Sequence, residues 1–205
     1  MFAVLIYPGV EELDFQGPWE MAGMWHKYAN GPKPVLVAAS QDAVTCAHGM
    51  RVLPDQTFAK CGPVEYLVVP GGFSAFDEMK NSVLLDFVRA HATNAKAVLS
   101  VCSGSFILLA AGLLAGRAAA TNWKAIGMLR EAGVDVREER YMQDGNVWTS
   151  AGVSAGIDAT LALIAHEAGE ATASCVQLNA EYYPSPKAYG EAHRQDQSAA
   201  YFRTL

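Results

Sequence analysis

The stretch Val98-Leu-Ser-Val-Cys-Ser-Gly-Ser-Phe106 joins a short apolar run to a group of small residues, with Cys102 between them. The first part is typical of a buried strand and the second of a helix start, so the stretch predicts a nucleophile elbow with cysteine in place of serine. In this geometry the thiol stands at the carboxyl edge of a sheet, where open α/β folds bind ligands. The adjoining helix N-terminus favours a thiolate, so we predict a depressed pKa for Cys102 and the highest reactivity of the four thiols. The alternative is a buried structural cysteine.

Strand-like and helix-like segments alternate on both sides of this elbow. The runs typical of strands are 2–7, 35–39, 66–69 and 97–101, with shorter ones at 134–136 and 146–149. The segments with a helical pattern are 14–28, 82–92, the stretch from the elbow to about 114, 123–132, 157–168 and 171–182. Residues 43–58 are expected to form a small excursion from the main sheet, with two short strands around His48-Gly49. The alternation predicts an α/β fold, a three-layer αβα sandwich with a mostly parallel sheet.

The length and composition fit one large domain. The chain has 205 residues, of which 51% are hydrophobic and 18% charged, so a mainly disordered chain is excluded. We predict a single domain over residues 1–184. The polar, proline-broken residues 185–205 are expected to form a C-terminal tail.

The charge pattern narrows the possible partners. Lys and Arg number 15 against 21 Asp and Glu, which gives a net charge of −6 without any basic run. This pattern argues against nucleic acid or an anionic membrane as the main partner. The longest apolar stretch, 106–115, is too short to cross a bilayer, and no signal-peptide pattern follows Met1. We therefore expect a cytoplasmic protein that acts on a small molecule.

The cysteines give no sign of a disulfide framework or a metal site. The four of them are widely scattered: Cys46, Cys61, Cys102 and Cys175. A cytosolic chain of this size does not need disulfides. The close pair of Cys46 and His48 lacks the paired spacing of a tetrahedral zinc site. The sequence therefore predicts no metal.

A second candidate element is the turn Pro70-Gly71-Gly72, which closes the 66–69 strand beside the elbow strand. Because glycine has no Cβ, such a pair lets the backbone approach a ligand and present an N–H to a developing anion. The competing interpretation is a plain tight turn.

Three carboxylates follow the first strand in the run Glu11-Glu-Leu-Asp-Phe-Gln-Gly-Pro18. One of them could supply an acid/base group beside the thiol. For Glu11 and Glu12 the simpler interpretation is a solvated loop or a favourable charge at a helix start. Asp14 is either the acid/base group or only the N-cap of the following helix, and these residues alone do not separate the two roles.

Five motifs occur in an order that resembles a known family. They are Glu11-Glu-Leu-Asp-Phe-Gln-Gly-Pro-Trp-Glu20, Val69-Pro-Gly-Gly72, Ser100-Val-Cys-Ser-Gly104, Thr149-Ser-Ala-Gly-Val-Ser-Ala-Gly-Ile-Asp158 and Gln177-Leu-Asn-Ala-Glu-Tyr-Tyr-Pro184. Together they resemble the ThiJ/PfpI superfamily over nearly the whole chain to about Pro184. Within it the chain is most similar to isonitrile hydratases and to the ligand-sensing domains of AraC-type regulators.

The resemblance implies a flavodoxin-like fold and a set of site residues. Cys102 matches the family's elbow cysteine, and Asp14 matches the acidic residue that hydrogen-bonds it. Ser103 stands where the hydratase branch usually has threonine, and Gly72 matches the glycine whose N–H helps to stabilise an anion. In the implied reaction a thiolate attacks the terminal isonitrile carbon, and water resolves the thioimidate to an N-substituted formamide. This chemistry needs no metal and no organic cofactor.

One position departs from the family pattern. Many relatives have Thr-His-Trp after the elbow helix, whereas this chain has Thr121-Asn122-Trp123. A Cys–His mechanism, such as glyoxalase-like hydration of a 2-oxoaldehyde, loses its base here, whereas the hydratase reaction asks only for Cys102 and Asp14. No motif places any of the chain's histidines at the elbow: His26, His48, His91, His166 and His193. A non-catalytic ligand- or oxidation-sensing domain, with Cys102 as its sensor thiol, is the alternative from another functional class.

Large apolar side chains near these motifs predict an oligomer. The 14–28 helix has more of them than a small monomer surface needs, namely Trp19, Met21, Met24 and Trp25. Together with the resemblance, this surplus predicts a homodimer. Four aromatic residues flank the candidate loops and could line an apolar pocket: Trp19, Trp25, Phe73 and Phe76. For Trp25, a place in the core or at an interface is the better explanation.

Overall fold

A computed structural model describes residues 1–184, 189–190 and 199–202 of the chain. Its centre is a seven-stranded sheet in the order β10-β11-β7-β6-β1-β2-β5. The strands are β1 (Phe2–Leu5), β2 (Pro34–Ala38), β5 (Gln56–Thr57), β6 (Tyr66–Val69), β7 (Ala97–Val101), β10 (Tyr141–Asp144) and β11 (Val147–Ser150). The β10–β11 pairing is antiparallel and the other pairings in this sheet are parallel. The predicted mostly parallel sheet is confirmed.

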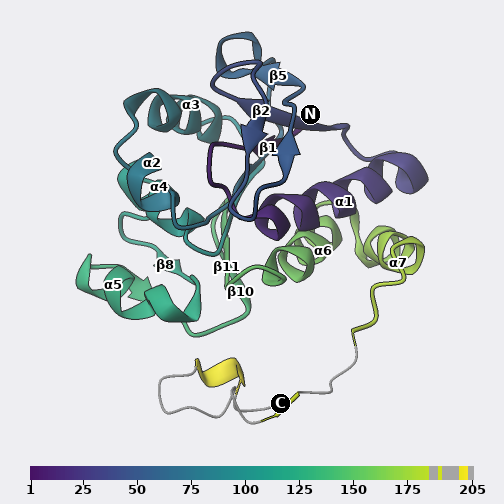
Figure 1. Ribbon diagram of the computed structural model, residues 1–205. Coiled ribbons are helices and arrows are strands. Elements are labelled where there is room, and N and C mark those ends of the chain that lie inside the picture. Colours follow the sequence, from purple (N-terminus) through teal and green to yellow (C-terminus); the bar gives the residue numbers. More distant parts are fainter. Residues whose placement is uncertain (185–188, 191–198, 203–205) are drawn as a thin grey trace.

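Helices cover both faces of this sheet (Figure 1). One layer contains α1 (Glu12–Ala29), α6 (Ala155–Ala168) and α7 (Glu170–Asn179), which pack on one another. The other layer contains α2 (Ala75–Glu78), α3 (Ser82–Ala92) and α4 (Gly104–Ala110). The predicted three-layer αβα sandwich is confirmed, and no helix in the described part of the chain is both long and apolar enough to cross a membrane.

Smaller elements lie outside the layers. The excursion after β2 is an antiparallel hairpin of β3 (Val44–Thr45) and β4 (Arg51–Val52), followed by a 3-10 turn, η1 (Phe58–Lys60). A second small pair joins β8 (Ala118–Ala119) to β9 (Asp135–Val136). Between these two strands lie η2 (Trp123–Ala125) and α5 (Ile126–Glu131), where one continuous helix over 123–132 was predicted.

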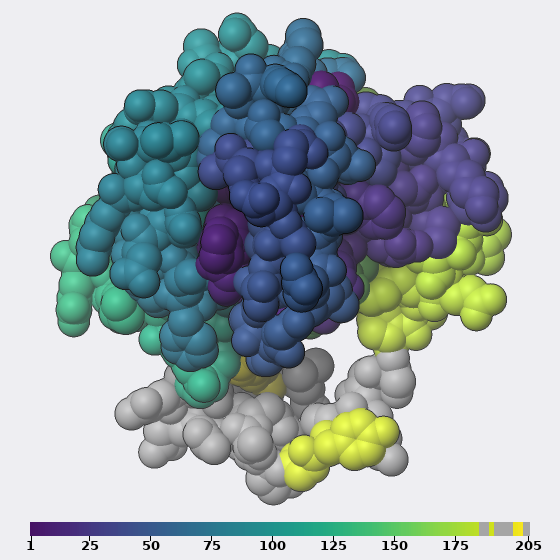
Figure 2. Space-filling view, turned by 45° about the horizontal axis from the view of Figure 1, so that its top comes forward, coloured from purple at the N-terminus to yellow at the C-terminus, as the bar shows by residue number. Residues whose placement is uncertain are grey.

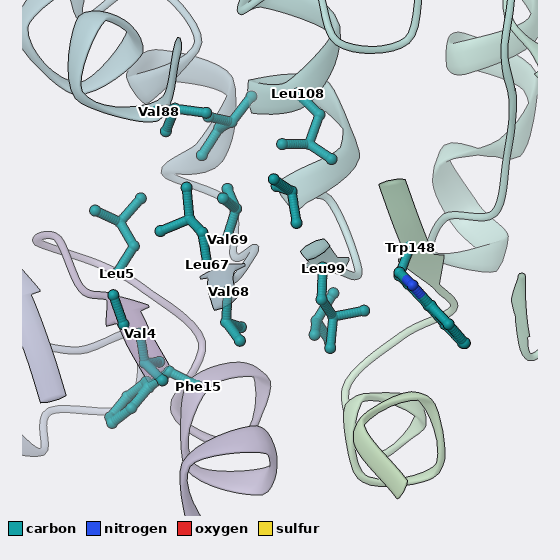
Figure 3. Close-up of a cluster of buried hydrophobic side chains, with 14 of the residues drawn as sticks. Val4, Leu5, Phe15, Leu67, Val68, Val69, Val88, Leu99, Leu108 and Trp148 are labelled. Carbon is teal, nitrogen blue, oxygen red and sulfur yellow. The ribbon is translucent and has the colours of Figure 1, made fainter. Parts of the chain in front are cut away.

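The core lies on both faces of the central strands (Figure 3). Val88 of α3 and Leu108 of α4 pack on one face, and Phe15 of α1 packs on the other. Strands β1, β6 and β7 are buried along their whole length. A parallel sheet covered by helices on both faces requires such continuous apolar strands.

The carboxyl ends of β1, β6, β7 and β11 meet at one edge of the sheet. The parallel register pairs Val69 with Ser100 and Val101 with Ser150, so the segments that follow these strands are neighbours. The fold therefore brings the elbow, the Gly71–Gly72 turn, the start of α1 and the turn at 151–153 together.

Most of the predicted tail, 185–205, lies outside the described residues. Residues 200–202 form a 3-10 turn, η4 (Ala200–Phe202), and the Phe202 ring lies 6.5 Å from the Trp123 ring.

Candidate active site

Cys102 occupies the turn between β7 and α4. Its φ is +58°, in the left-handed region that non-glycine residues seldom adopt. Three bonds hold this turn. The Cys102 N–H donates to the Ala151 carbonyl at 3.0 Å, the Thr121 hydroxyl donates to the Cys102 carbonyl at 3.0 Å, and the Ser105 hydroxyl donates to Thr121 Oγ1 at 2.8 Å.

Asp14 lies fully buried in the first turn of α1. The N-cap of the helix is Glu11, so the interpretation of Asp14 as a mere N-cap is wrong. Asp14 Oδ2 accepts the Gly71 N–H at 2.9 Å. Its other oxygen, Oδ1, is buried and has no hydrogen bond of good geometry among the described residues. The Cys102 thiol and the Val153 N–H lie beside this carboxyl group and favour its charged form.

Gly71 and Gly72 press the loop after β6 against these groups. Gly72 N–H donates to Ser103 Oγ at 3.0 Å, and the Ser103 hydroxyl donates to the Gly72 carbonyl at 2.8 Å. A Cβ on Gly71 would lie 2.6 Å from Ser103 N and 2.9 Å from Asp14 Oδ2, so only glycine fits. The N–H groups of both glycines are thus bonded to site side chains.

Tyr7 holds the loop after β6 through its side-chain hydroxyl. It is buried two residues after β1, and its hydroxyl donates to the Pro70 carbonyl at 2.7 Å and the Gly71 carbonyl at 3.0 Å. Tyr7 was not predicted as a site residue from the sequence. The available signal was its position as the last residue of the apolar run 2–7, at the sheet edge where the loop after β6 also begins.

Two further groups approach the thiol without having been predicted as site residues. The backbone N–H of Val153, in the turn after β11, lies near both Cys102 and Asp14. The side-chain amide of Asn122 lies near the Cys102 sulfur. Val153 is also in the left-handed region, with a φ of +50°.

Burial raises the pKa of Asp14 from 3.8 to about 7. The bond from Gly71 opposes this shift and the negative charge of Glu11 adds to it. Burial, together with the negative charge of the neighbouring Asp14 carboxylate, raises the pKa of the Cys102 thiol to about 12. The N–H groups of Ser103, Val153 and Asn122 favour the thiolate but do not outweigh burial.

The predicted depressed pKa of Cys102 is therefore wrong. A short helix begins at the elbow as expected, but a single buried thiol beside a carboxylate loses more from desolvation and like charge than helix N–H groups return. At neutral pH Cys102 is therefore a neutral thiol. The Asp14 carboxyl group is near its own pKa at this pH, so both its protonated and its ionised forms are populated.

A cavity of about 390 Å³ opens above the thiol. Its apolar walls include Phe73, Phe76, Trp123 and Met128. Its polar lining residues are Glu11, Cys102, Ser103, Asn122 and Lys124. The other two aromatic residues predicted to flank the pocket lie elsewhere: Trp19 on an outer groove of α1, and Trp25 against Tyr66 with ring centres 5.5 Å apart.

The loop after β1 forms the Glu11 side of this cavity. It is tied to the β3–β4 hairpin, because Gly9 N–H donates to the Thr45 carbonyl at 2.8 Å and Ala47 N–H to the Val10 carbonyl at 2.9 Å. In the view of Figure 2, the dark purple start of the chain surfaces as a small patch enclosed between blue and teal segments.

One group of described residues has the spacing of metal ligands. Ligand atoms of Glu11, Glu12 and His48 lie within 4.8 Å of one another at the surface, and Cys46 is not part of the group. His48 is exposed and its Nε2 lies 3.0 Å from Glu11 Oε1. Among the described residues no histidine lines the cavity above Cys102; His193 lies outside the described part. All four cysteines are free.

Comparisons with known proteins agree with this architecture. The isonitrile hydratase of Pseudomonas putida is 37% identical over 184 residues, which cover 89% of this chain and 78% of that protein. Deglycase PH1704 of Pyrococcus horikoshii is 31% identical over 141 residues, covering 67% of this chain and 84% of the relative.

A solved structure of a ThiJ/PfpI family protein from Pseudomonas syringae superimposes with a TM-score of 0.87. The two sequences are 36% identical, and the match covers 99% of this chain and 82% of that one. The DJ-1/PfpI family profile matches residues 2–166. The chain belongs to the DJ-1/PfpI family.

Proposed function

We propose that this protein adds water to isonitriles and releases N-substituted formamides, with Cys102 and Asp14 as its catalytic residues. The observation that carries the proposal is the buried Asp14 carboxyl group beside the buried Cys102 thiol, close enough for the carboxylate to accept the thiol proton. The similarity to an isonitrile hydratase supports the same reaction.

The first half of the reaction uses the thiol proton. Asp14 takes it from Cys102, and the thiolate attacks the terminal carbon of the isonitrile. The carbon then takes the proton back from Asp14, which leaves a thioimidate, R–N=CH–S–Cys102. A carboxyl group with a pKa of about 7 suits both transfers, because it can accept and return a proton near neutral pH.

The second half adds water. Its oxygen bonds to the thioimidate carbon and its two protons end on the nitrogen and on the sulfur, by way of Asp14. The C–S bond then breaks, and the formamide leaves with Cys102 restored as a thiol. The sum is one isonitrile plus one water, without a redox step.

The remaining predicted site residues position these groups. The N–H of Gly72 would reach an anion only by leaving Ser103 Oγ, so we assign Gly71, Gly72 and Ser103 to holding the loop against Asp14 and the elbow. The aromatic walls of the cavity favour an apolar substituent on the isonitrile nitrogen.

The test is incubation of the purified protein with one aryl and one alkyl isonitrile, with formamide followed by mass spectrometry. We expect product from the wild-type protein and from Cys175→Ala, a control thiol outside the cavity, and none from Cys102→Ala. Absence of product from the wild type, or turnover by Cys102→Ala, would contradict the proposal. Methylglyoxal in a parallel assay tests the glyoxalase-like alternative, which we expect to fail because no described histidine lines the cavity.

We further propose that the protein forms a homodimer through α1. Trp19 is 36% exposed there, and it lines an apolar groove of about 630 Å³ with Leu13 and Met24. Met21 and Trp25, which the sequence analysis counted toward this surface, are buried in the core of the single chain. Sedimentation at micromolar concentration should give a dimer, and Trp19→Glu should dissociate it.

A further inference from the structure

Asn122 is tied to the nucleophile through the backbone. The preceding residue, Thr121, is buried, and its hydroxyl donates to the Cys102 carbonyl at 3.0 Å. Asn122 and Cys102 line the same cavity. The position of the Asn122 side chain relative to the sulfur is therefore set by the elbow itself.

The two ends of the Asn122 amide have different partners. Its Oδ1 accepts the backbone N–H of Lys124 at 3.0 Å, as the cap of η2. Because Lys124 N–H is a donor, the end that meets it must be the oxygen, and the NH₂ end points the other way. That end packs directly over Gly152, where a Cβ would collide with Nδ2. The amide is thus held in one orientation, with its donor end toward the site.

We propose that Asn122 is a catalytic hydrogen-bond donor whose side-chain N–H binds the Cys102 sulfur. Its contribution to turnover rests on the proposed hydratase function, whereas its contact with the sulfur does not. An amide neither gains nor loses a proton at neutral pH, so it binds the sulfur without taking part in proton transfer.

This donor acts at two points of the cycle. The sulfur carries negative charge when it attacks the isonitrile carbon and again when it leaves the tetrahedral intermediate. A hydrogen bond to an ionised acceptor is about twice as strong as one to a neutral acceptor. The Asn122 N–H therefore stabilises the thiolate more than the thiol, in the same direction as the nearby N–H groups of Ser103 and Val153.

The alternative role is purely structural, as the cap of η2. The substitution Asn122→Asp keeps the Oδ1 that caps Lys124 and replaces the donor by an acceptor, but its added negative charge also disfavours the thiolate. A neutral variant is therefore needed to separate the two roles. Gly152→Ala is an independent variant, since its Cβ displaces the Asn122 donor without changing any charge. Two controls match these changes. Asn81 caps α3 through Oδ1 in the same way, and Gly127 has no atom within 4 Å of an added Cβ.

The experiment measures the rate of Cys102 alkylation by iodoacetamide at pH 9, with the modified peptide quantified by mass spectrometry. Below the thiol pKa this rate falls about tenfold for each unit by which the pKa rises. We expect Asn122→Asp to slow alkylation about tenfold or more and Gly152→Ala to slow it several-fold. Asn81→Asp and Gly127→Ala should leave the rate within twofold.

A second measurement gives the shift directly. In an Asp14→Asn background the neighbouring carboxylate is gone, so the Cys102 pKa falls and its titration becomes accessible. Adding the neutral change Gly152→Ala should raise the Cys102 pKa again by about half a unit. If Gly152→Ala leaves alkylation within twofold, Asn122 is only a cap and the proposal is wrong, whatever the rate of Asn122→Asp, because the charge of that variant slows alkylation by itself. These readouts need no isonitrile, so a protein without hydratase activity would contradict the proposed function and leave the assignment of Asn122 to be decided by alkylation.

Discussion

The neighbouring strands β7 and β11 are each followed by a turn that contains a non-glycine residue with a positive φ, but the two turns contribute different groups to the site. β7 is followed by Cys102 with a φ of +58°, β11 is followed after two residues by Val153 with a φ of +50°, and each turn leads into a helix. The strands pair in parallel, and the Cys102 N–H donates to the Ala151 carbonyl, so the turns are joined. The first turn presents a side chain to the site, and the second presents a backbone N–H.

This difference explains why the role of the Cys102 turn could be predicted from the sequence and that of the Val153 turn could not. A nucleophile must be a particular residue type, so Cys102 followed by Ser-Gly carries a chemical signal. A backbone N–H can come from almost any residue, and the run at 150–156 indicates only a turn of small residues. A β-branched residue with a positive φ is a conformational outlier, and it becomes visible only in the structure.

The largest expected effect comes from Asp14, the carboxyl group that lies near both turns. Asp14→Asn keeps the shape and an acceptor for Gly71 N–H but removes the transferable proton. General acid–base catalysis contributes about 10²–10⁴-fold, so isonitrile turnover should fall by that factor. Wild-type kcat/KM should rise with pH through about 7, as the carboxylate that accepts the thiol proton forms.

The control for this variant is its own pH profile, which should lack the rise near neutral pH. Near-normal turnover by Asp14→Asn would contradict the Cys–Asp mechanism even if Cys102 proves essential.

The second effect concerns stability and has a defined sign. The folded pKa of Asp14 is about 7 against an ordinary 3.8, so the unfolded chain releases this proton at lower pH than the folded protein. The free energy of unfolding of the wild type therefore falls as the pH rises from 3.8 to about 7 and the unfolded chain, but not the folded protein, releases this proton. Asp14→Asn avoids the loss and should be more stable than wild type by on the order of 4 kcal/mol at pH 8. At pH 4 the two should agree closely.

Urea denaturation at the two pH values measures this difference. An equal gap at both would show that the Asp14 carboxyl group is not the group that titrates.

A smaller loss is expected from the elbow turn. Ser103→Ala leaves the N–H and the carbonyl of Gly72 without their buried partner, which costs about 1–3 kcal/mol of folding free energy. Ser103→Thr keeps the hydroxyl and should stay closer to wild type. Ser40→Ala, which removes an exposed hydroxyl bonded to Asp42, serves as the control in chemical denaturation. A Ser103→Ala protein as stable as this control would mean that the link to Gly72 adds nothing.

The smallest effect is expected from the second turn. Val153→Gly removes a strained β-branched residue, worth about 1–2 kcal/mol, but adds the backbone entropy cost of glycine, about 0.5–1 kcal/mol. The net change in the free energy of unfolding should be about 1 kcal/mol or less. Turnover should stay within about twofold because the N–H is kept. A large loss of turnover would instead give the Val153 side chain a part in catalysis and make the two turns alike.

The buried central elements were predictable with their bounds. β6, β7 and α3 begin and end where the sequence analysis placed them, because continuous apolar runs and one clear amphipathic face leave little ambiguity. The edge strand β10 was missed because its residues Tyr141 to Asp144 alternate between exposed and half-buried positions, and the two-residue strands β5 and β8 are too short for any period. The elbow helix ends at Ala110, four residues before the predicted bound.

The site was predictable in its parts but not in its electrostatics. Cys102, Asp14 and the glycine turn could be named from spacing and resemblance. The direction of the Cys102 pKa could not, because it depends on how deeply the thiol is buried and how near it lies to Asp14. The contacts of Asn122 and Tyr7 were likewise hidden, since each depends on which backbone groups the fold brings beside it.

The hydrogen bonds of the Gly71–Gly72 loop also make its motion measurable by amide hydrogen exchange. Both amide hydrogens end on buried side-chain oxygens, those of Asp14 and Ser103, while the Tyr7 hydroxyl binds the loop's carbonyls. A buried amide exchanges with deuterium only while its hydrogen bond is open to solvent. The exchange rate at these two glycines therefore reports openings of the loop beside Cys102 and Asp14, separately from fraying of the sheet. A ligand that binds at Cys102 should slow this exchange.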